Sequence, residues 1–283
     1  MPEPLIRNIS DTARWAALYR ARESERPDAH FRDPLARKLA GERGEQIACS
    51  MAFTEKHAWT WTTRTVLFDR FISEQIQQGA DMVVNLAAGL DTRPYRMALP
   101  PALQWIEVDL PGILDYKEEV LKGEKPVCVL ERFRLDLADV IARRELFSKL
   151  GQRAKKVLIV TEGLLIYLSA DEVGALAKDL APVPSFQRWV IDLASPGLLE
   201  MMQKQMGSKL DEAGVPFKFA PSEGPEYFTP FGWKPVDVRG MLKTAAKLKR
   251  LSLGMWFLSL LPESKGKQGK RPWSGICLLE KTG

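Results

Sequence analysis

Cysteine is scarce in this sequence, and the three cysteines are too far apart to form a familiar cross-link or metal motif. They stand at Cys49, Cys128 and Cys277, and no C-x-x-C pair occurs. An odd number of separated cysteines favours neither a disulfide framework nor a zinc site. The first ten residues also lack the apolar segment of a secretory signal. These absences favour a reducing, cytoplasmic location.

No uninterrupted apolar run is long enough to span a membrane, so we expect no stable membrane insertion. The longest candidate, Leu251–Leu261, is stopped by Pro262 and follows a stretch rich in lysine and arginine at 243–250. Such a segment could lie on a membrane surface as a basic amphipathic helix. We expect instead a buried helix with a solvated basic lead-in, because apolar runs of this length commonly fill a protein core.

A clustered basic face is also missing. The net charge is +5, but the basic residues are spread along the chain apart from 243–250 and Lys265–Arg271. Proteins that bind nucleic acid usually carry a clustered basic face with interleaved aromatic residues. The sequence therefore predicts no nucleic-acid partner.

The stretch between Asp81 and Asp109 has the layout of a nucleoside-binding unit. Met82–Leu86 is a short apolar run typical of a buried parallel strand. Three small residues follow at 87–89, and they allow a tight turn that a ligand can approach closely. Asp109 ends the next apolar run, twenty residues after Gly89. An acid at this distance can accept hydrogen bonds from the two hydroxyls of a ribose.

The composition of this turn separates two kinds of ligand. A dinucleotide site has three glycines, in the pattern G-x-G-x-x-G, which let a pyrophosphate approach. This turn has one glycine, Gly89. An adenosyl ligand without phosphates needs only the acid for its ribose and one close backbone approach. S-adenosylmethionine therefore fits better, and a nicotinamide oxidoreductase on a similar fold remains the alternative.

Residues 1–80 contain no clear strand and are predicted to form an N-terminal helical cap. Helical patterns cover Asp11–Arg26, a segment from Asp33 towards Ile47, and Trp59–Gln77. A cap of this kind is what an enzyme needs to enclose a small-molecule ligand.

From residue 81 to 283, strands alternate with helices, which predicts a mostly parallel, seven-stranded sheet of the Rossmann-like α/β class. Residues 196–232 break this alternation and are rich in Met, Gly, Pro and Phe. We interpret them either as an irregular connection or as a lid over the substrate. The predicted strands are Met82–Leu86, Trp105–Val108, Val127–Phe133, Val157–Val160, Trp189–Leu193, Trp233–Arg239 and Ser274–Glu280.

Small or acidic residues follow four of these strands. They are Gly89, Asp109, Asp136 and Glu162. In parallel sheets the ligand binds outside the carboxyl ends of the strands. The coincidence at four strand ends therefore predicts one shared ligand site.

Several segments resemble motifs of one enzyme family. Asn85–Arg96 resembles the "GAGLDTRxYR" turn of the leucine carboxyl methyltransferase family, whose bacterial relatives are polyketide-type O-methyltransferases. Thr63–Asp69, Trp105–Pro111 and Thr161–Leu168 resemble its other motifs in the correct order. One departure is Ala87, which stands at the first glycine of the family turn. The resemblance covers most of the chain, and it implies a class I methyltransferase fold that uses S-adenosylmethionine.

The resemblance also implies roles for individual residues. Arg64 would pair with the methionine carboxylate, and arginine suits this role because it forms bidentate pairs with carboxylates. Asp109 would hold the ribose, and Glu162 would line the methionine or sulfonium end. The full set of cofactor-binding residues implied in this way is Arg64, Ala87, Gly89, Asp109, Leu110, Asp136, Leu137 and Glu162.

Each of these assignments has a simpler structural alternative. Arg64 could be a helix-surface residue, and Asp136 could merely cap the next helix. Asp109 could cap a strand end, with Glu107 on the same strand face as the rival ribose acceptor. Glu162 could be the ion-pair partner of Arg93 or Arg96.

The expected reaction is transfer of a methyl group to an oxygen of a small-molecule acid, phenol or alcohol. Only His30 and His57 are available as histidine bases, both in the cap, and neither is favoured by its sequence context. The lack of an obvious base favours a carboxylate acceptor, which needs none. A protein that binds the cofactor but only docks a partner, for example through Leu251–Leu261, is the alternative. The residues predicted to contact the acceptor are Arg93, Tyr95, Tyr167 and Tyr227.

Overall fold

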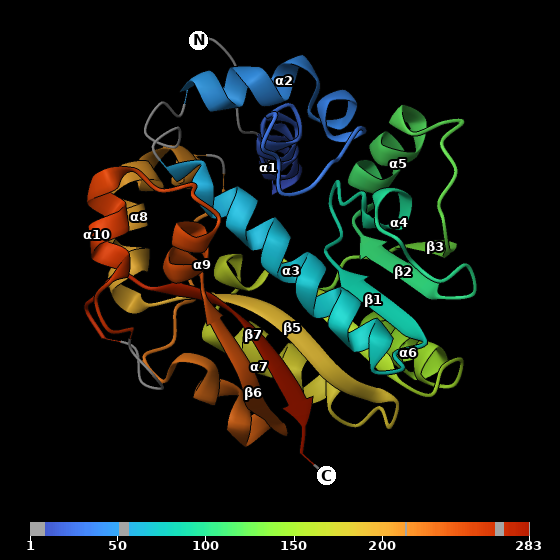
Figure 1. The fold of residues 1–283 in the computed structure, drawn as a ribbon. Helices are drawn as coiled ribbons and strands as arrows, with labels where there is room; N and C mark the ends of the chain where they lie inside the picture. Colours follow the sequence, from blue (N-terminus) through green and yellow to red (C-terminus); the bar gives the residue numbers. More distant parts are fainter. Residues whose placement is uncertain (1–8, 51–56, 213, 264–268, 283) are drawn as a thin grey trace.

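A seven-stranded sheet runs through the centre of the computed structural model, which describes residues 9–50, 57–212, 214–263 and 269–282 (Figure 1). The strand order is β3-β2-β1-β4-β5-β7-β6. Strands β1 to β5 pair in parallel, and β7 runs antiparallel to both β5 and β6. The predicted mostly parallel, seven-stranded α/β sheet is confirmed. The strands are β1 Met82–Leu86, β2 Gln104–Asp109, β3 Val129–Arg134, β4 Val157–Thr161, β5 Phe186–Ala194, β6 Trp233–Gly240 and β7 Ser274–Lys281.

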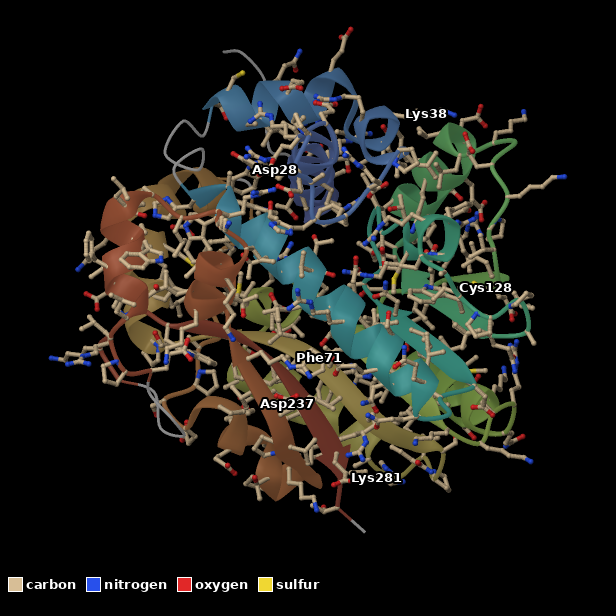
Figure 2. The ribbon with its side chains drawn as sticks, in the orientation of Figure 1. Asp28, Lys38, Phe71, Cys128, Asp237 and Lys281 are labelled. Carbon is tan, nitrogen blue, oxygen red and sulfur yellow. The ribbon has the colours of Figure 1, made fainter. Side chains whose placement is uncertain are left out.

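Helices cover both faces of this sheet. Every residue of the central strands β1 and β4 is buried, as their continuous apolar runs predict. Helix α3 (Trp59–Gln77) packs along one face of the sheet. Its Phe71 belongs to the same buried apolar cluster as Val83 of β1 and Leu158 of β4 (Figure 2). Helices α6 (Val140–Gly151) and α7 (Ala170–Leu180) pack on the other face. The remaining helices on the sheet are α4 Arg93–Arg96, α5 Pro111–Val120 and α9 Met241–Lys247.

The N-terminal helices pack on each other above the carboxyl ends of the strands (Figure 1). They are α1 (Ile9–Ser24) and α2 (Ala36–Ser50), and α2 is kinked at Gly41, whose φ is 59°. Two hydrogen bonds join this cap to the turn after β1. Arg20 donates to the Leu90 carbonyl at 2.6 Å, and the Thr92 hydroxyl donates to Asp33 at 2.6 Å. The cap is therefore bonded directly to the predicted ligand site.

Residues 196–232 contain more regular structure than the sequence indicates. Helix α8 covers Pro196–Glu212, and a 3-10 helix, η3, covers Gly224–Phe231. The η3 segment packs against α7, β5 and β6, and its Phe228 ring contacts the ring of Trp189 on β5. The first part of the insertion, by contrast, lies beside the cavity described below.

The prediction of a buried helix at Leu251–Leu261 is wrong. Helix α10 covers Leu253–Ser259, and most of its large apolar side chains are exposed, for example 81 % of Leu253 and 63 % of Phe257. The sequence shows that the segment is apolar, but it does not show which neighbours could cover it. In the described part of the chain, no helix is long and apolar enough to cross a bilayer.

Candidate functional site

A cavity of about 600 Å³ lies at the carboxyl ends of the central strands. Its walls come mainly from the cap, the N-terminal half of α3, the turns after β1, β2, β3 and β4, the end of β5, and helix α8. All eight residues predicted to bind the cofactor line it. The structure thus brings together residues that are up to 98 positions apart in the chain, such as Arg64 and Glu162.

The turn after β1 is held against the end of β2 by one carboxylate. Asp109 accepts a hydrogen bond from the Gly89 amide at 2.6 Å and another from the Leu110 amide at 2.7 Å. Ala87 and Gly89 have φ angles of 57° and 48°, which places both in the left-handed region. Burial raises the pKa of the Asp109 carboxyl, although the two backbone donors oppose this shift. Asp109 thus shapes the turn and also faces the cavity.

Glu107, the rival for the ribose, lies in a different environment. Its side chain is fully buried and does not line the cavity. It pairs with Lys117 at 2.7 Å and with Arg132 at 2.8 Å. Asp109 sits at the end of β2, where a ligand can reach it, and Glu107 sits within the strand beneath α5.

Asp136 and Leu137 lie together on the cavity wall beyond β3. The Asp136 carboxylate also accepts the Ala138 amide at 2.9 Å, so it does form a local turn. This contact is compatible with a binding role because a carboxylate has a second oxygen to offer.

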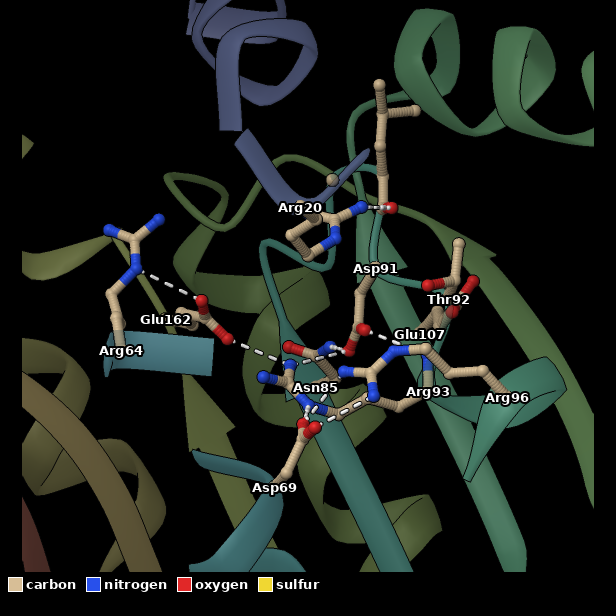
Figure 3. A network of polar contacts seen from close by, with 12 residues as sticks. Arg20, Arg64, Asp69, Asn85, Asp91, Thr92, Arg93, Arg96, Glu107 and Glu162 are labelled. Carbon is tan, nitrogen blue, oxygen red and sulfur yellow. Dashed lines mark hydrogen bonds and ion pairs between the residues drawn. The ribbon is translucent and has the colours of Figure 1, made fainter. Parts of the chain in front are cut away.

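Glu162 bridges two arginines at the end of β4 (Figure 3). One of its oxygens accepts from Arg64 Nε at 3.0 Å, and the other lies 2.8 Å from a terminal nitrogen of Arg93. The alternative that Glu162 is an ion-pair partner of Arg93 is therefore present in the structure. The terminal nitrogens of Arg64 point away from Glu162 in Figure 3.

Arg93 is buried, with only 3 % of its side chain exposed, and it contacts several carboxylates. It contacts Asp69 at 2.7 Å and Asp91 at 3.1 Å, besides Glu162. Arg96 also binds Asp69, with both terminal nitrogens (Figure 3). Burial would raise the pKa of Asp91, but the charges of Arg93, Lys117 and Arg96, with the backbone amide of Arg93, together lower it to about 2. Arg93 also lines the cavity, and its three carboxylate partners indicate a structural role.

The three tyrosines predicted to contact the acceptor are placed differently from one another. Tyr167 lines the cavity and packs against Phe217, with ring centroids 5.4 Å apart. Tyr95 and Tyr227 do not line it. The Tyr95 hydroxyl accepts a hydrogen bond from Arg132, and the Tyr227 hydroxyl donates to the Ala170 carbonyl. Only Tyr167 is therefore in position to meet an acceptor.

Asp192 is a cavity residue that the sequence analysis missed. It lies near the end of β5, accepts the Gly163 amide at 2.8 Å, and is 3.7 Å from Arg64. Burial raises the pKa of this carboxyl. A signal was available, because Asp192 is the one charged residue in the run WVIDLA at the end of a predicted strand.

Apolar and aromatic side chains also line the cavity, and we call this group of residues the acceptor chamber. The rings of Trp15 and Trp61 lie 4.9 Å apart there. The chamber draws side chains from the cap, α3, the turn after β4, α8 and the segment after α8. Its main residues are Trp15, Trp61, Tyr167, Met201, Met202 and Phe217.

The sheet with its single reversed strand, and the strand-end cavity with its acidic residues, define a Rossmann-like class I methyltransferase. The family model of leucine carboxyl methyltransferases matches residues 13–181. The chain belongs to the leucine carboxyl methyltransferase family.

Individual relatives agree with this assignment. The chain is 35 % identical to a "putative S-adenosyl-L-methionine-dependent methyltransferase" of Streptomyces coelicolor over 67 % of its length and 70 % of the relative. A crystal structure of a DUF574 family protein from Streptomyces avermitilis has a TM-score of 0.61 at 12 % identity, covering 96 % of this chain and 97 % of that one. A "putative methyltransferase" from Thermobifida fusca has a TM-score of 0.57 at 18 % identity, covering 99 % and 96 %. These two structures support the fold.

Proposed function

We propose that this S-adenosylmethionine-dependent methyltransferase transfers the methyl group to an oxygen atom of a small apolar acceptor. One observation carries the proposal: a single cavity joins the polar strand-end residues to the acceptor chamber. A shared cavity lets the protein hold two reactants in line, and such alignment can supply up to about 7–11 kcal/mol of the barrier reduction.

The residues at the strand ends fit the cofactor. Asp109 lines the cavity with a carboxylate suited to a ribose diol, and Arg64 has terminal nitrogens suited to a carboxylate. A β-carbon at position 89 would come within 3.3 Å of Ala13. Glycine therefore leaves room for the cofactor to approach the backbone of this turn closely. When bound, the cofactor supplies a methyl group that its sulfonium already activates.

The acceptor chamber supports an uncharged, apolar acceptor. Arg64 is assigned to the carboxylate of the cofactor, and the other arginines on the cavity wall already pair with carboxylates: Arg20 with Asp33, Arg93 with three acids, and Arg143 with Asp179. An anionic acceptor would have to compete with one of these carboxylates. We therefore place a phenol or alcohol ahead of the carboxylate that the sequence favours.

Of the two histidines, His57 is the one that we propose as the base for a hydroxyl acceptor. It lines the cavity just before α3, whereas His30 bonds the Leu248 carbonyl at 2.7 Å and does not line it. A positioned general base typically speeds such a proton transfer by about 10²–10⁴-fold.

The methionines and Phe217 on the α8 side also support the proposal that the first part of 196–232 acts as a lid.

Transfer of labelled methyl from S-adenosylmethionine to matched apolar phenols, alcohols and carboxylic acids tests this proposal. We expect the hydroxyl compounds to be methylated. We expect His57→Gln to slow their methylation without slowing the methylation of any carboxylic acid. Methylation of the carboxylic acids alone would overturn the preference for a hydroxyl. Methylation only at nitrogen, in a parallel panel of apolar amines, would overturn the O-methyl proposal.

Replacing Asp109 with asparagine is expected to weaken S-adenosylhomocysteine binding by about 1–3 kcal/mol, because a buried diol loses its charged acceptor. Since burial raises the pKa of Asp109, the wild-type affinity should fall on acidification above the usual aspartate range. The variant should lose this pH dependence. Calorimetric titration across pH measures both effects, with exposed Asp115→Asn as the control. An unchanged affinity would remove Asp109 from the ribose site.

Replacing Arg64 with methionine is expected to weaken S-adenosylhomocysteine by about 1.5–3 kcal/mol, the range for a hydrogen bond to a charged group. Binding of 5′-methylthioadenosine, which lacks the amino-acid carboxylate, should change much less. Calorimetry with both ligands compares the two losses. Equal losses would show that Arg64 acts through its contact with Glu162 and not on the ligand.

A further inference from the structure

Helix α10 and the two residues after it present an unusual concentration of exposed apolar side chains, which we call the apolar patch (residues 253–261). Among the described residues, twelve large apolar side chains are strongly exposed, and six of them lie in this patch. Monomeric proteins rarely expose contiguous apolar surface without using it to contact a partner or a membrane. The six are Leu253, Trp256, Phe257, Leu258, Leu260 and Leu261.

The helix buries only Ser259 and exposes most of its large apolar residues. Ser259 is buried, and its hydroxyl bonds the Trp256 carbonyl at 2.6 Å. Trp256 and Phe257 are 43 % and 63 % exposed, with their rings in contact. Figure 1 shows α10 at the outer edge of the molecule, beside α8 and α9. This orientation is the reverse of that of a helix that packs on a protein core.

Strong positive charge flanks the patch along the chain. Residues 251–262 contain no charged residue, whereas 243–271 as a whole hold eight lysines and arginines and one acid, a net charge of +7. The complete chain carries only +5, so the rest of it is slightly acidic. Arg250 is tied to Glu23 and Asp28, but Lys243, Lys247 and Lys249 are exposed.

We infer that the apolar patch and its basic flanks seat the protein on the surface of an anionic lipid bilayer. A short apolar helix can lie in the headgroup region, and flanking lysines are attracted to anionic lipids. A second copy of this chain is a poorer occupant, because it would bring an equally basic segment to the same place. This contact leaves the proposed methyl transfer untouched, because none of the six exposed side chains lines the cavity.

Co-sedimentation of the full chain with vesicles tests the inference. We expect binding to phosphatidylcholine vesicles that contain phosphatidylserine, little binding to phosphatidylcholine alone, and weaker binding in high salt. The double variant Trp256→Ser/Phe257→Ser should lower the partition coefficient at least about tenfold. Lys243→Glu/Lys247→Glu should lower binding to the anionic vesicles alone.

The matched control is Val236→Ser/Val238→Ser, because both valines are 44 % exposed on β6, away from the patch. This control should bind vesicles like the wild type. Thermal unfolding and S-adenosylhomocysteine titration check that every variant is folded. Absence of wild-type binding to anionic vesicles, or equal loss in the control, would overturn the inference. So would a concentration-dependent dimer in sedimentation velocity that Trp256→Ser/Phe257→Ser dissolves, since it would make the patch a self-interface.

Discussion

Replacing Glu107 with glutamine is expected to reduce the free energy of unfolding by about 3–5 kcal/mol, because it leaves a buried cation without its carboxylate partner. Lys117 and Glu107 are both fully buried, and Arg132 completes the cluster from β3. The amide keeps the shape of the side chain but removes the charge that both cations face. Urea denaturation of wild type and variant measures the difference, provided both unfold in one transition.

The matched control is Glu145→Gln, whose partner Lys149 is 74 % exposed, and it should cost less than about 1 kcal/mol. Losses of similar size in Glu107→Gln and Glu145→Gln would contradict the buried-cluster account.

Replacing Arg93 with methionine is expected to cost at least as much, about 3–5 kcal/mol, because Asp69, Asp91 and Glu162 would then face one another with less positive charge. Arg96 remains beside Asp69 and limits the loss. Denaturation at several pH values measures it. Since the charge of Arg93 helps to lower the pKa of Asp91 to about 2, its removal lets acids in the cluster take up protons more readily. The deficit of the variant should therefore shrink as the pH falls.

The same variant tests the acceptor role that the sequence analysis predicts for Arg93. If Arg93 held an anionic acceptor, the acceptor KM would rise while the stability stayed near that of the wild type. Arg153→Met, which removes a half-exposed partner of Glu131, is the control for loss of an ordinary surface pair.

The fold was predictable because its signals are local and strong. Continuous apolar runs marked β1 and β4, and helical periodicity placed Trp59–Gln77 at the bounds of α3. The rule that ligands bind at the carboxyl ends of parallel strands then predicted one site for Gly89, Asp109 and Glu162, and all three line the cavity.

The features that could not be predicted from the sequence depend on contacts between distant segments. Glu107 and Asp109 lie on one strand face, and only the positions of Lys117 and Arg132 separate their environments. Tyr227 looks available in the sequence, yet η3 carries it onto α7. The exposure of α10 likewise depends on which elements lie beside it, and apolar composition alone does not contain that information.

The hydrogen bonds between the cap and the turn after β1 bear on the timing of the reaction cycle. Arg20 and Asp33 anchor the cap to Leu90 and Thr92, immediately beside Gly89. Any swing of the cap that frees the product has to break these charge-assisted bonds. If release uses such a swing, we expect it to be a gated step with its own barrier that competes with chemistry to set the turnover rate.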